Sequence, residues 1–167
     1  MHQAWDFLFY RIKEGDKVMI NELFNEKTVE LNVEVKNWEE AINFCGNLFV
    51  ENGNTEPRYT KAMINTVKTM GQYIVIEKGI AMPHARPEDG VKKIGMGLVK
   101  LKSPIKFGND EYDPVDILIF ICAVDKMSHV KALAELMALI EDNDFLKIVR
   151  NSSSKQDVLN YIKSKEF

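Results

Sequence analysis

One segment of this 167-residue chain, residues 78–90 (KGIAMPHARPEDG), has a composition that suits neither a helix nor a central strand. Its glycines permit backbone angles that other residues avoid, and its two prolines fix φ and favour extended backbone just before them. The segment is therefore predicted to be a stiff, exposed loop that presents the imidazole of His84 and, two residues on, the guanidinium of Arg86. An imidazole can act as a nucleophile or base near neutral pH, so His84 is a candidate catalytic residue. The competing interpretation is an ordinary surface or turn histidine.

A second histidine, His129, follows a nearly continuous apolar run over residues 115–124. Such a run is typical of a strand covered on both faces, and it is predicted to be the central strand. Asp125 can cap a helix over residues 128–140, which places His129 in the first turn of that helix. Open α/β sheets commonly place their sites at strand ends and helix N-termini, so His129 and His84 are predicted to lie close together. The competing interpretation of His129 is an exposed first-turn residue.

The elements that must position these histidines are predicted from hydrophobic periodicity. Apolar alternation or β-branched residues predict three further strands, over residues 29–35, 73–76 and 94–101. Helical spacing and capping residues predict helices that begin near Asn37, near Pro57, near Phe145 and at Ser153, the last with Gln156 in a capping box. Strands and helices in this order predict an α/β fold, a single domain whose mixed central β-sheet is flanked by helices on both faces.

Two groups of side chains within these elements are predicted to be buried. The helix after Pro57 and the helix over residues 128–140 each carry an apolar stripe. The stripe residues are Tyr59, Ala62, Met63, Thr66, Val67 and Met70 in the first, and Val130, Leu133, Leu136, Met137 and Ile140 in the second. Gly95 and Gly97 lack the following helix of a nucleotide-binding turn, so they indicate close backbone packing instead.

Composition limits the compartment and the partners. A hydrophobic fraction of 46% with 28% charged residues is typical of a soluble globular protein, and a net charge of −3 gives no basic footprint for nucleic acid. No apolar run approaches the length that spans a bilayer. Cys45 and Cys122 lie in apolar segments, which indicates buried, reduced thiols of a cytoplasmic protein. The histidines and cysteines lack metal-ligand spacing, so no metal is expected.

The chain is predicted to divide into an N-terminal extension over residues 1–18 and one domain over residues 19–167. The extension carries Trp5, Phe7 and Phe9 but lacks the apolar length and cleavage site of a signal peptide. A regular pattern of apolar residues begins at Met19. The apolar residues of the extension also suggest a homodimer as a hypothesis.

Other site chemistries lack their motifs. There is no Gly-x-Ser-x-Gly for a hydrolase, and no Gly-rich loop followed by Lys-Ser or Lys-Thr for direct use of ATP. A phosphoryl donor would therefore be another protein. A neutral imidazole can accept a phosphoryl group when the ring is exposed, its other nitrogen is anchored, and nearby donors stabilise the charge. The His84 loop can meet these three conditions.

Several motifs together resemble a known family. They are residues 56–59 (EPRY), 79–93 (GIAMPHARPEDGVKK) and 113–118 (DPVDIL), with Phe107-Gly108 and His129. In combination they resemble the enzyme IIA component of the bacterial phosphoenolpyruvate-dependent sugar phosphotransferase system, in its mannitol/fructose class and most closely its L-ascorbate branch. The match runs from about Met19 to Phe167, and the combination is far more specific than the Pro-His dipeptide alone.

The resemblance implies a phosphotransferase in which His84 accepts a phosphoryl group from the phosphocarrier protein HPr and passes it to a cysteine of the cognate IIB component. The membrane IIC component is then an indirect partner, and no small cofactor is required. His129 matches the supporting histidine that donates a hydrogen bond to the phosphoryl group. Mannitol members carry an arginine where this chain has Thr66, so Arg86 is our hypothesis for the substitute charge stabiliser.

Three further points stay open from the sequence. An apolar surface around Ile80 and Met82 is predicted to receive HPr. One alternative is a regulatory phosphoprotein of the same fold, and another is an interaction module whose histidine is never phosphorylated. The sugar, the oligomeric state and the phosphorylated nitrogen of His84 are not determined by the sequence.

Overall fold

The computed structural model describes residues 20–165, so the predicted extension over residues 1–18 lies outside the described part. Among the described residues, no helix combines the length and hydropathy needed to cross a membrane. The elements follow in chain order: α2 (Ile20–Leu23), β1 (Val29–Val33), α3 (Trp38–Glu51), α4 (Pro57–Met70), the 3₁₀ helix η1 (Gly71–Ile74), β2 (Val75–Glu77), β3 (Ile80–Ala81), the 3₁₀ helix η2 (Pro87–Asp89), β4 (Gly95–Ile105), β5 (Val115–Cys122), α5 (Lys126–Ile140), α6 (Asn143–Asn151) and α7 (Lys155–Ser164).

The five strands form one mixed sheet in the order β1-β4-β5-β3-β2. β1 is parallel to β4 and β3 is parallel to β5, whereas β4–β5 and β2–β3 are antiparallel pairs. β5 is therefore the central strand, as its apolar sequence predicted. Every residue of β5 except Asp116 is buried.

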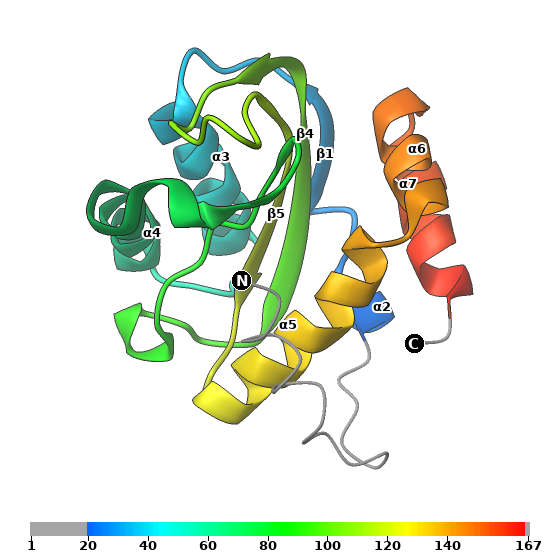
Figure 1. Cartoon of the computed structure of the whole chain (residues 1–167). Coiled ribbons are helices and arrows are strands. Elements are labelled where there is room, and N and C mark those ends of the chain that lie inside the picture. The colour runs from blue at the N-terminus through cyan, green and yellow to red at the C-terminus, as the bar shows by residue number, and fades with distance from the viewer. Residues whose placement is uncertain (1–19, 166–167) are drawn as a thin grey trace.

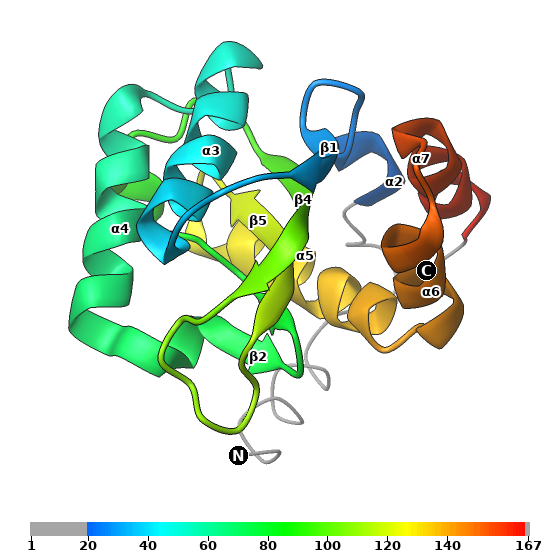
Figure 2. The ribbon, with the colours of Figure 1, turned by 90° about the horizontal axis from the view of Figure 1, so that it is seen from above.

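Helices cover both faces of this sheet (Figures 1 and 2), which confirms the predicted fold class. α3 and α4 pack on one face, against β5 residues such as Leu118 and Phe120. α2, α5, α6 and α7 pack on the other face, where Ile117, Ile119 and Ile121 of β5 point. Successive side chains of a strand point to opposite faces, so this one strand contributes to both cores.

The helices begin where short polar side chains cap them. The Asn37 side chain accepts a hydrogen bond from Glu40 N at 2.9 Å at the start of α3, and Asp125 accepts from Ser128 N at 2.7 Å at the start of α5. Both caps were predicted. The capping box predicted for the last helix is wrong, because its N-cap is Ser154 and makes no side-chain bond. The Ser152 hydroxyl instead bonds the Asp157 carboxylate at 2.7 Å.

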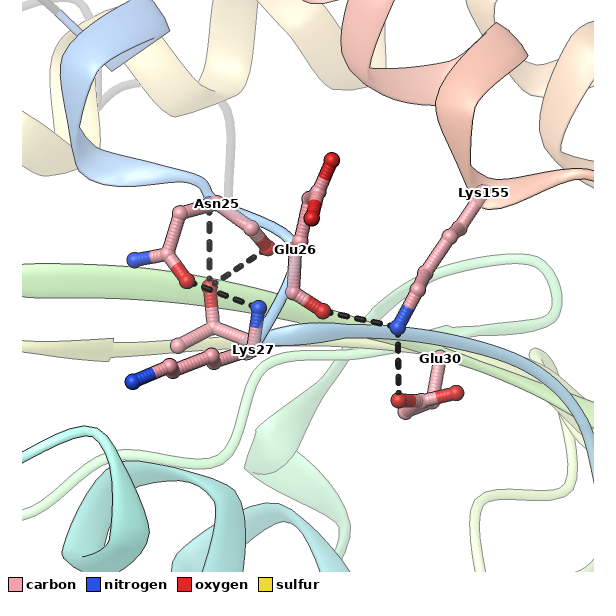
Figure 3. Close-up of polar contacts among 6 residues, drawn as sticks. Asn25, Glu26, Lys27, Glu30 and Lys155 are labelled. Carbon is pink, nitrogen blue, oxygen red and sulfur yellow. Dashed lines mark hydrogen bonds and ion pairs between the residues drawn. The ribbon is translucent and has the colours of Figure 1, made fainter.

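α7 is also attached to β1, the edge strand at one side of the sheet (Figure 3). The ammonium of Lys155 donates to the Glu26 carbonyl oxygen at 2.8 Å and pairs with the Glu30 carboxylate at 2.9 Å. Asn25 orders the same turn, because its side chain accepts from Lys27 N at 2.8 Å. These contacts hold the C-terminal helix beside β1.

The glycines of β4 confirm the prediction of close packing. A side chain at Gly97 would overlap the Phe120 ring and lie 2.7 Å from the Thr28 carbonyl oxygen, and one at Gly95 would overlap Asn54. The Phe120 ring lies edge-on to Phe49 of α3, with 4.7 Å between the ring centroids. Glycine at position 97 thus creates the space in which an aromatic residue of the central strand packs.

Two predictions about α4 and the strand after it are wrong. Met70, assigned to the buried stripe, is 57% exposed, and Tyr73, assigned to a strand, is 64% exposed in η1. Gly71, with φ of 57°, ends α4, and the 3₁₀ turn that follows delays the strand to Val75. The backbone of Ile74 is used elsewhere, since its carbonyl oxygen accepts from Met82 N at 2.9 Å.

The other elements differ from prediction mainly at their ends. β3 was not predicted, and β4 extends to Ile105. In α5, Leu136 and Ile140 are buried as predicted, but the helix is rotated so that Ala132 and Leu139 complete the buried set. Val130, Leu133 and Met137 are half-buried.

Candidate functional site

The two candidate histidines leave the sheet at the same edge because β3 and β5 run parallel. Ile80 and Ala81 of β3 pair with Ile117 and Leu118 of β5. The chain leaves β3 directly into the His84 loop, and it leaves β5 at Cys122, passes through Asp125 and enters α5. Strand ends of this kind are where open α/β sheets build their sites.

His84 and His129 lie beside each other, as predicted. Their ring centroids are 5.5 Å apart and the ring planes are inclined by 42°. Both side chains are half-buried. The two imidazoles are therefore close enough to contact the same bound group.

The His84 ring is oriented by its own loop. Its Nδ1 atom lies 2.8 Å from the Met82 carbonyl oxygen. A carbonyl oxygen can only accept a hydrogen bond, so this contact assigns the proton to Nδ1 and leaves the lone pair on Nε2. The nitrogen without a proton is the nucleophilic one.

Backbone hydrogen bonds fix the peptide units on both sides of His84. Before it, Met82 N donates to the Ile74 carbonyl at 2.9 Å, and the Pro83 carbonyl accepts from Ile121 N at 3.4 Å. After it, Ala85 N donates to the Tyr59 hydroxyl oxygen at 3.0 Å. The loop is therefore attached to η1, to the central strand and to α4.

The far end of the loop is closed by a short turn. Asp89 accepts from Arg86 N at 3.0 Å through its side chain, and its own N–H donates back to the Arg86 carbonyl at 3.0 Å. Arg58 of α4 donates to the Glu88 carbonyl at 2.8 Å. Residues 56–59, which carry part of the family resemblance, thus hold the loop in place.

The surroundings of His129 differ from those of His84. Its Nδ1 atom is buried and has no hydrogen-bond partner among residues 20–165. Burial, with repulsion from the neighbouring His84, holds the pKa of His129 below its usual range. The ring is therefore neutral at pH 7, and one nitrogen is left without a protein partner.

Apolar side chains are exposed at the start of α5, where Val124 is 49% and Met127 63% exposed. The prediction of an apolar docking surface around Ile80 and Met82 is wrong, because these residues are 0% and 2% exposed and pack in the core beneath α5. The helices packed on this face of the sheet cover both side chains. The exposed apolar side chains near His129 in the sequence are instead those of Val124 and Met127.

Arg86 is exposed, and within residues 20–165 its guanidinium forms no hydrogen bond or ion pair. The structure thus places Arg86 at the edge of the loop without a bond to either histidine. Thr66, which the family resemblance matched with the mannitol-class arginine, donates its hydroxyl to the Ala62 carbonyl at 2.9 Å within α4. The role of Arg86 stays a hypothesis.

One contributor to the site was missed from the sequence. Tyr59 was assigned to the core stripe of α4, and it is indeed fully buried, but its hydroxyl also bonds the loop that carries His84. A buried tyrosine usually finds a hydrogen-bond partner. That rule was the available signal, although it could not name the partner.

Other reactive groups are not arranged for chemistry. Cys45 and Cys122 are buried free thiols, and burial raises the pKa of both, that of Cys122 to about 12. Within the described part of the chain, no cluster of three or more histidine, cysteine or acidic side chains could hold a metal ion.

Comparison with known proteins identifies similar chains. The family model described as "Phosphoenolpyruvate-dependent sugar phosphotransferase system, EIIA 2" matches residues 22–165. The chain is 41% identical over 141 residues to the ascorbate-specific PTS system EIIA component of Escherichia coli K12, covering 84% of this chain and 92% of that protein.

Solved structures agree with this comparison. The solution structure of the mannitol-specific cryptic phosphotransferase enzyme IIA from E. coli aligns with a TM-score of 0.79 at 30% identity, covering 89% of this chain and all (100%) of that one. The complex of enzyme IIAMtl with phosphorylated enzyme IIBMtl from E. coli aligns with a TM-score of 0.75 at 26% identity, covering 86% and 100%.

Proposed function

This chain belongs to the EIIA type 2 family of the phosphoenolpyruvate-dependent sugar phosphotransferase system, and we propose that it carries a phosphoryl group on His84 from phospho-HPr to a cysteine of a IIB component. EIIA components are phosphotransferases that act between proteins. The observation that carries the assignment to His84 is its orientation. The contact of Nδ1 with the Met82 carbonyl leaves Nε2 free, beside a second imidazole at a sheet edge.

In the first step the Nε2 lone pair of His84 attacks the phosphorus atom of phosphohistidine on HPr. A P–N bond to His84 forms while the P–N bond to the HPr histidine breaks, and that histidine keeps the bonding electron pair. In the second step a thiolate of IIB attacks the same phosphorus, so a P–S bond forms and the His84 P–N bond breaks. The proton stays on Nδ1 and remains hydrogen-bonded to the Met82 carbonyl oxygen throughout, so the protein need not reorient the ring.

His129 has the role of a hydrogen-bond donor to the phosphoryl oxygens. Phosphoryl transfer passes through a loose transition state, so positioned donors supply most of the catalysis. A neutral His129 carries one N–H, and its ring lies close enough to His84, at 5.5 Å between centroids, to reach a phosphoryl group carried there. Arg86 is proposed to add positive charge from the exposed side of the loop.

The partners follow from the family. One of the solved structures that resemble this chain is a complex of an EIIA with its phosphorylated IIB. We infer a matching IIB acceptor for this chain. Phospho-HPr is the proposed donor, and the membrane IIC component takes part only through IIB. We place this chain in the cytoplasm, where it would meet these partners. A homodimer stays a hypothesis. The relatives named ascorbate-specific favour L-ascorbate as the sugar.

The test is phosphoryl transfer from phosphorylated HPr, followed by intact mass. The parent protein is expected to gain one phosphoryl group, and His84→Ala none. His84→Ala removes a half-buried ring whose hydrogen bond within residues 20–165 is to its own loop, so the variant should remain folded by circular dichroism. If the His84→Ala protein is still phosphorylated, His84 is not the phosphoryl acceptor.

A second reaction separates the alternatives. The phosphorylated protein is mixed with a IIB component from the ascorbate branch, and transfer to its cysteine is measured. Transfer supports the transport role. Phosphorylation without transfer would favour the regulatory phosphoprotein, and absence of phosphorylation by a verified donor would favour the interaction module.

A further inference from the structure

We propose that Tyr59 is a positioning residue for phosphoryl transfer, whose buried hydroxyl fixes the His84 loop against the central strand that leads to His129. The hydroxyl accepts from Ala85 N at 3.0 Å and donates to the Ile121 carbonyl at 2.8 Å. Ala85 directly follows His84. This inference rests on the proposed role of His84, but it concerns a different residue and a different measurement.

The hydroxyl joins two segments that are otherwise connected weakly at this point. Its single proton belongs to the bond with Ile121, since the Ala85 carbonyl is further away, at 3.4 Å. The other direct backbone bond between these segments is the long one from Ile121 N to the Pro83 carbonyl, at 3.4 Å. The two hydrogen bonds of the Tyr59 hydroxyl, at 3.0 and 2.8 Å, are thus each shorter than the direct bond between the His84 loop and β5.

The tyrosine itself is held rigidly. It is 0% exposed, and its ring packs 6.4 Å from that of Phe49 between centroids. Burial raises its pKa well above the usual range, so the hydroxyl keeps its proton at every pH at which the protein works. An anchor of this kind holds the loop independently of pH.

The rate of phosphoryl transfer depends on how precisely the reacting groups are positioned. The two segments that meet at Tyr59 are those that carry the two imidazoles, and Ile121 is four residues before Asp125, the cap of the His129 helix. A displacement of about 1 Å between reacting groups can slow a reaction roughly 100-fold. Loss of the hydroxyl leaves Ala85 N–H without its acceptor and Ile121 C=O without its donor, so the loop should shift or exchange between positions.

The experiment compares Tyr59→Phe with the matched control Tyr161→Phe in the full chain. Tyr161 also donates its hydroxyl, to Asp142 at 2.8 Å, but joins α7 to the start of α6. Long-range ¹H–¹⁵N spectra report which nitrogen of each imidazole carries the proton. Initial rates with phosphorylated HPr give kcat and KM at a temperature at which all three proteins are folded.

In Tyr59→Phe the His84 ring is expected to populate both tautomers, and kcat is expected to fall roughly 10- to 100-fold with little change in KM. Tyr161→Phe should keep the parent tautomer and the parent kcat. Parent-like spectra and kcat in Tyr59→Phe would overturn the proposal, and so would equal losses in the two variants. If the parent is not phosphorylated at all, the proposed function fails, while the tautomer spectra still decide the role of Tyr59.

Discussion

The two histidines of the site are neighbours in space but are held in opposite ways. His84 has one ring nitrogen on a backbone carbonyl, and the peptides around it are bonded to three different elements. His129 lies in the first turn of its helix, and its buried Nδ1 has no hydrogen-bond partner within residues 20–165. One imidazole is fixed before any partner arrives, whereas the other keeps a free nitrogen.

This difference suggests that the two histidines have different roles in phosphoryl transfer. A nucleophile benefits from a fixed orientation because its lone pair must be aligned with the bond that breaks. A donor to phosphoryl oxygens needs an unused N–H, and a protein acceptor would have occupied it. The contrast leads to three predictions, which follow from the largest expected effect to the smallest.

Removal of the His129 ring should slow transfer while leaving His84 oriented. His129→Ala is expected to lower the initial rate of phosphorylation by roughly 100-fold, which is typical for the loss of one transition-state donor. The proton of His84 should stay on Nδ1, because its acceptor is the Met82 carbonyl. Quench-flow rates and imidazole ¹⁵N spectra measure the two effects.

The matched variant for this test is His129→Asn, which keeps an N–H donor on a shorter side chain. It should retain more activity than His129→Ala. If His129→Ala moves the His84 proton, the two imidazoles are coupled rather than independent, and the contrast between them is incorrect.

Loss of the exposed cation should have a smaller effect. Arg86→Ala is expected to slow transfer by up to about fivefold, because exposed charges contribute about 1 kcal/mol or less. The effect should disappear at high salt, which screens exposed charges. Lys147→Ala, an exposed cation on α6, serves as the control and should be neutral. Equal rates for Arg86→Ala and the parent at low salt would end the hypothesis that Arg86 stabilises charge.

The smallest expected effect is on the way the free energy of unfolding changes with pH. Because the folded-state pKa of His129 is below its reference value of 6.5, the unfolded chain binds more protons between those two values. The contribution of His129 to the free energy of unfolding should therefore be constant above pH 6.5 and fall as the pH drops from 6.5 to the folded-state pKa. Urea unfolding of the parent and of His129→Asn across this range isolates the term. An identical pH dependence in both proteins would contradict the burial of the ring.

The sequence predicted those elements whose signal is local. The cap at Asn37, the apolar run of β5 and the glycines of β4 each leave a clear pattern within a few residues. β3 could not be predicted, because a two-residue strand is defined by its neighbours β5 and β2 rather than by its own composition. The β-branched propensity of residues 73–76 was likewise overridden, since the loop requires the Ile74 carbonyl as an acceptor.

The site was also predictable only where its signal is local in the sequence. The proline-flanked loop and the strand end pointed to His84 and His129, and both lie where expected. Ile80 and Met82 were predicted wrongly because apolar residues next to a loop suggest a contact surface, whereas the helices on this face of the sheet bury them. The Tyr59 hydroxyl was beyond reach, since it joins residues 26 and 62 positions away along the chain.

The parallel pairing of β3 with β5 also has a kinetic consequence. Both histidine-bearing segments leave the sheet at one edge, so the proposed donor and acceptor must use the same surface, and they must use it in turn. On the proposed function, HPr has to dissociate before IIB can bind. We expect ping-pong kinetics, with parallel lines in double-reciprocal plots and competition between unphosphorylated HPr and IIB.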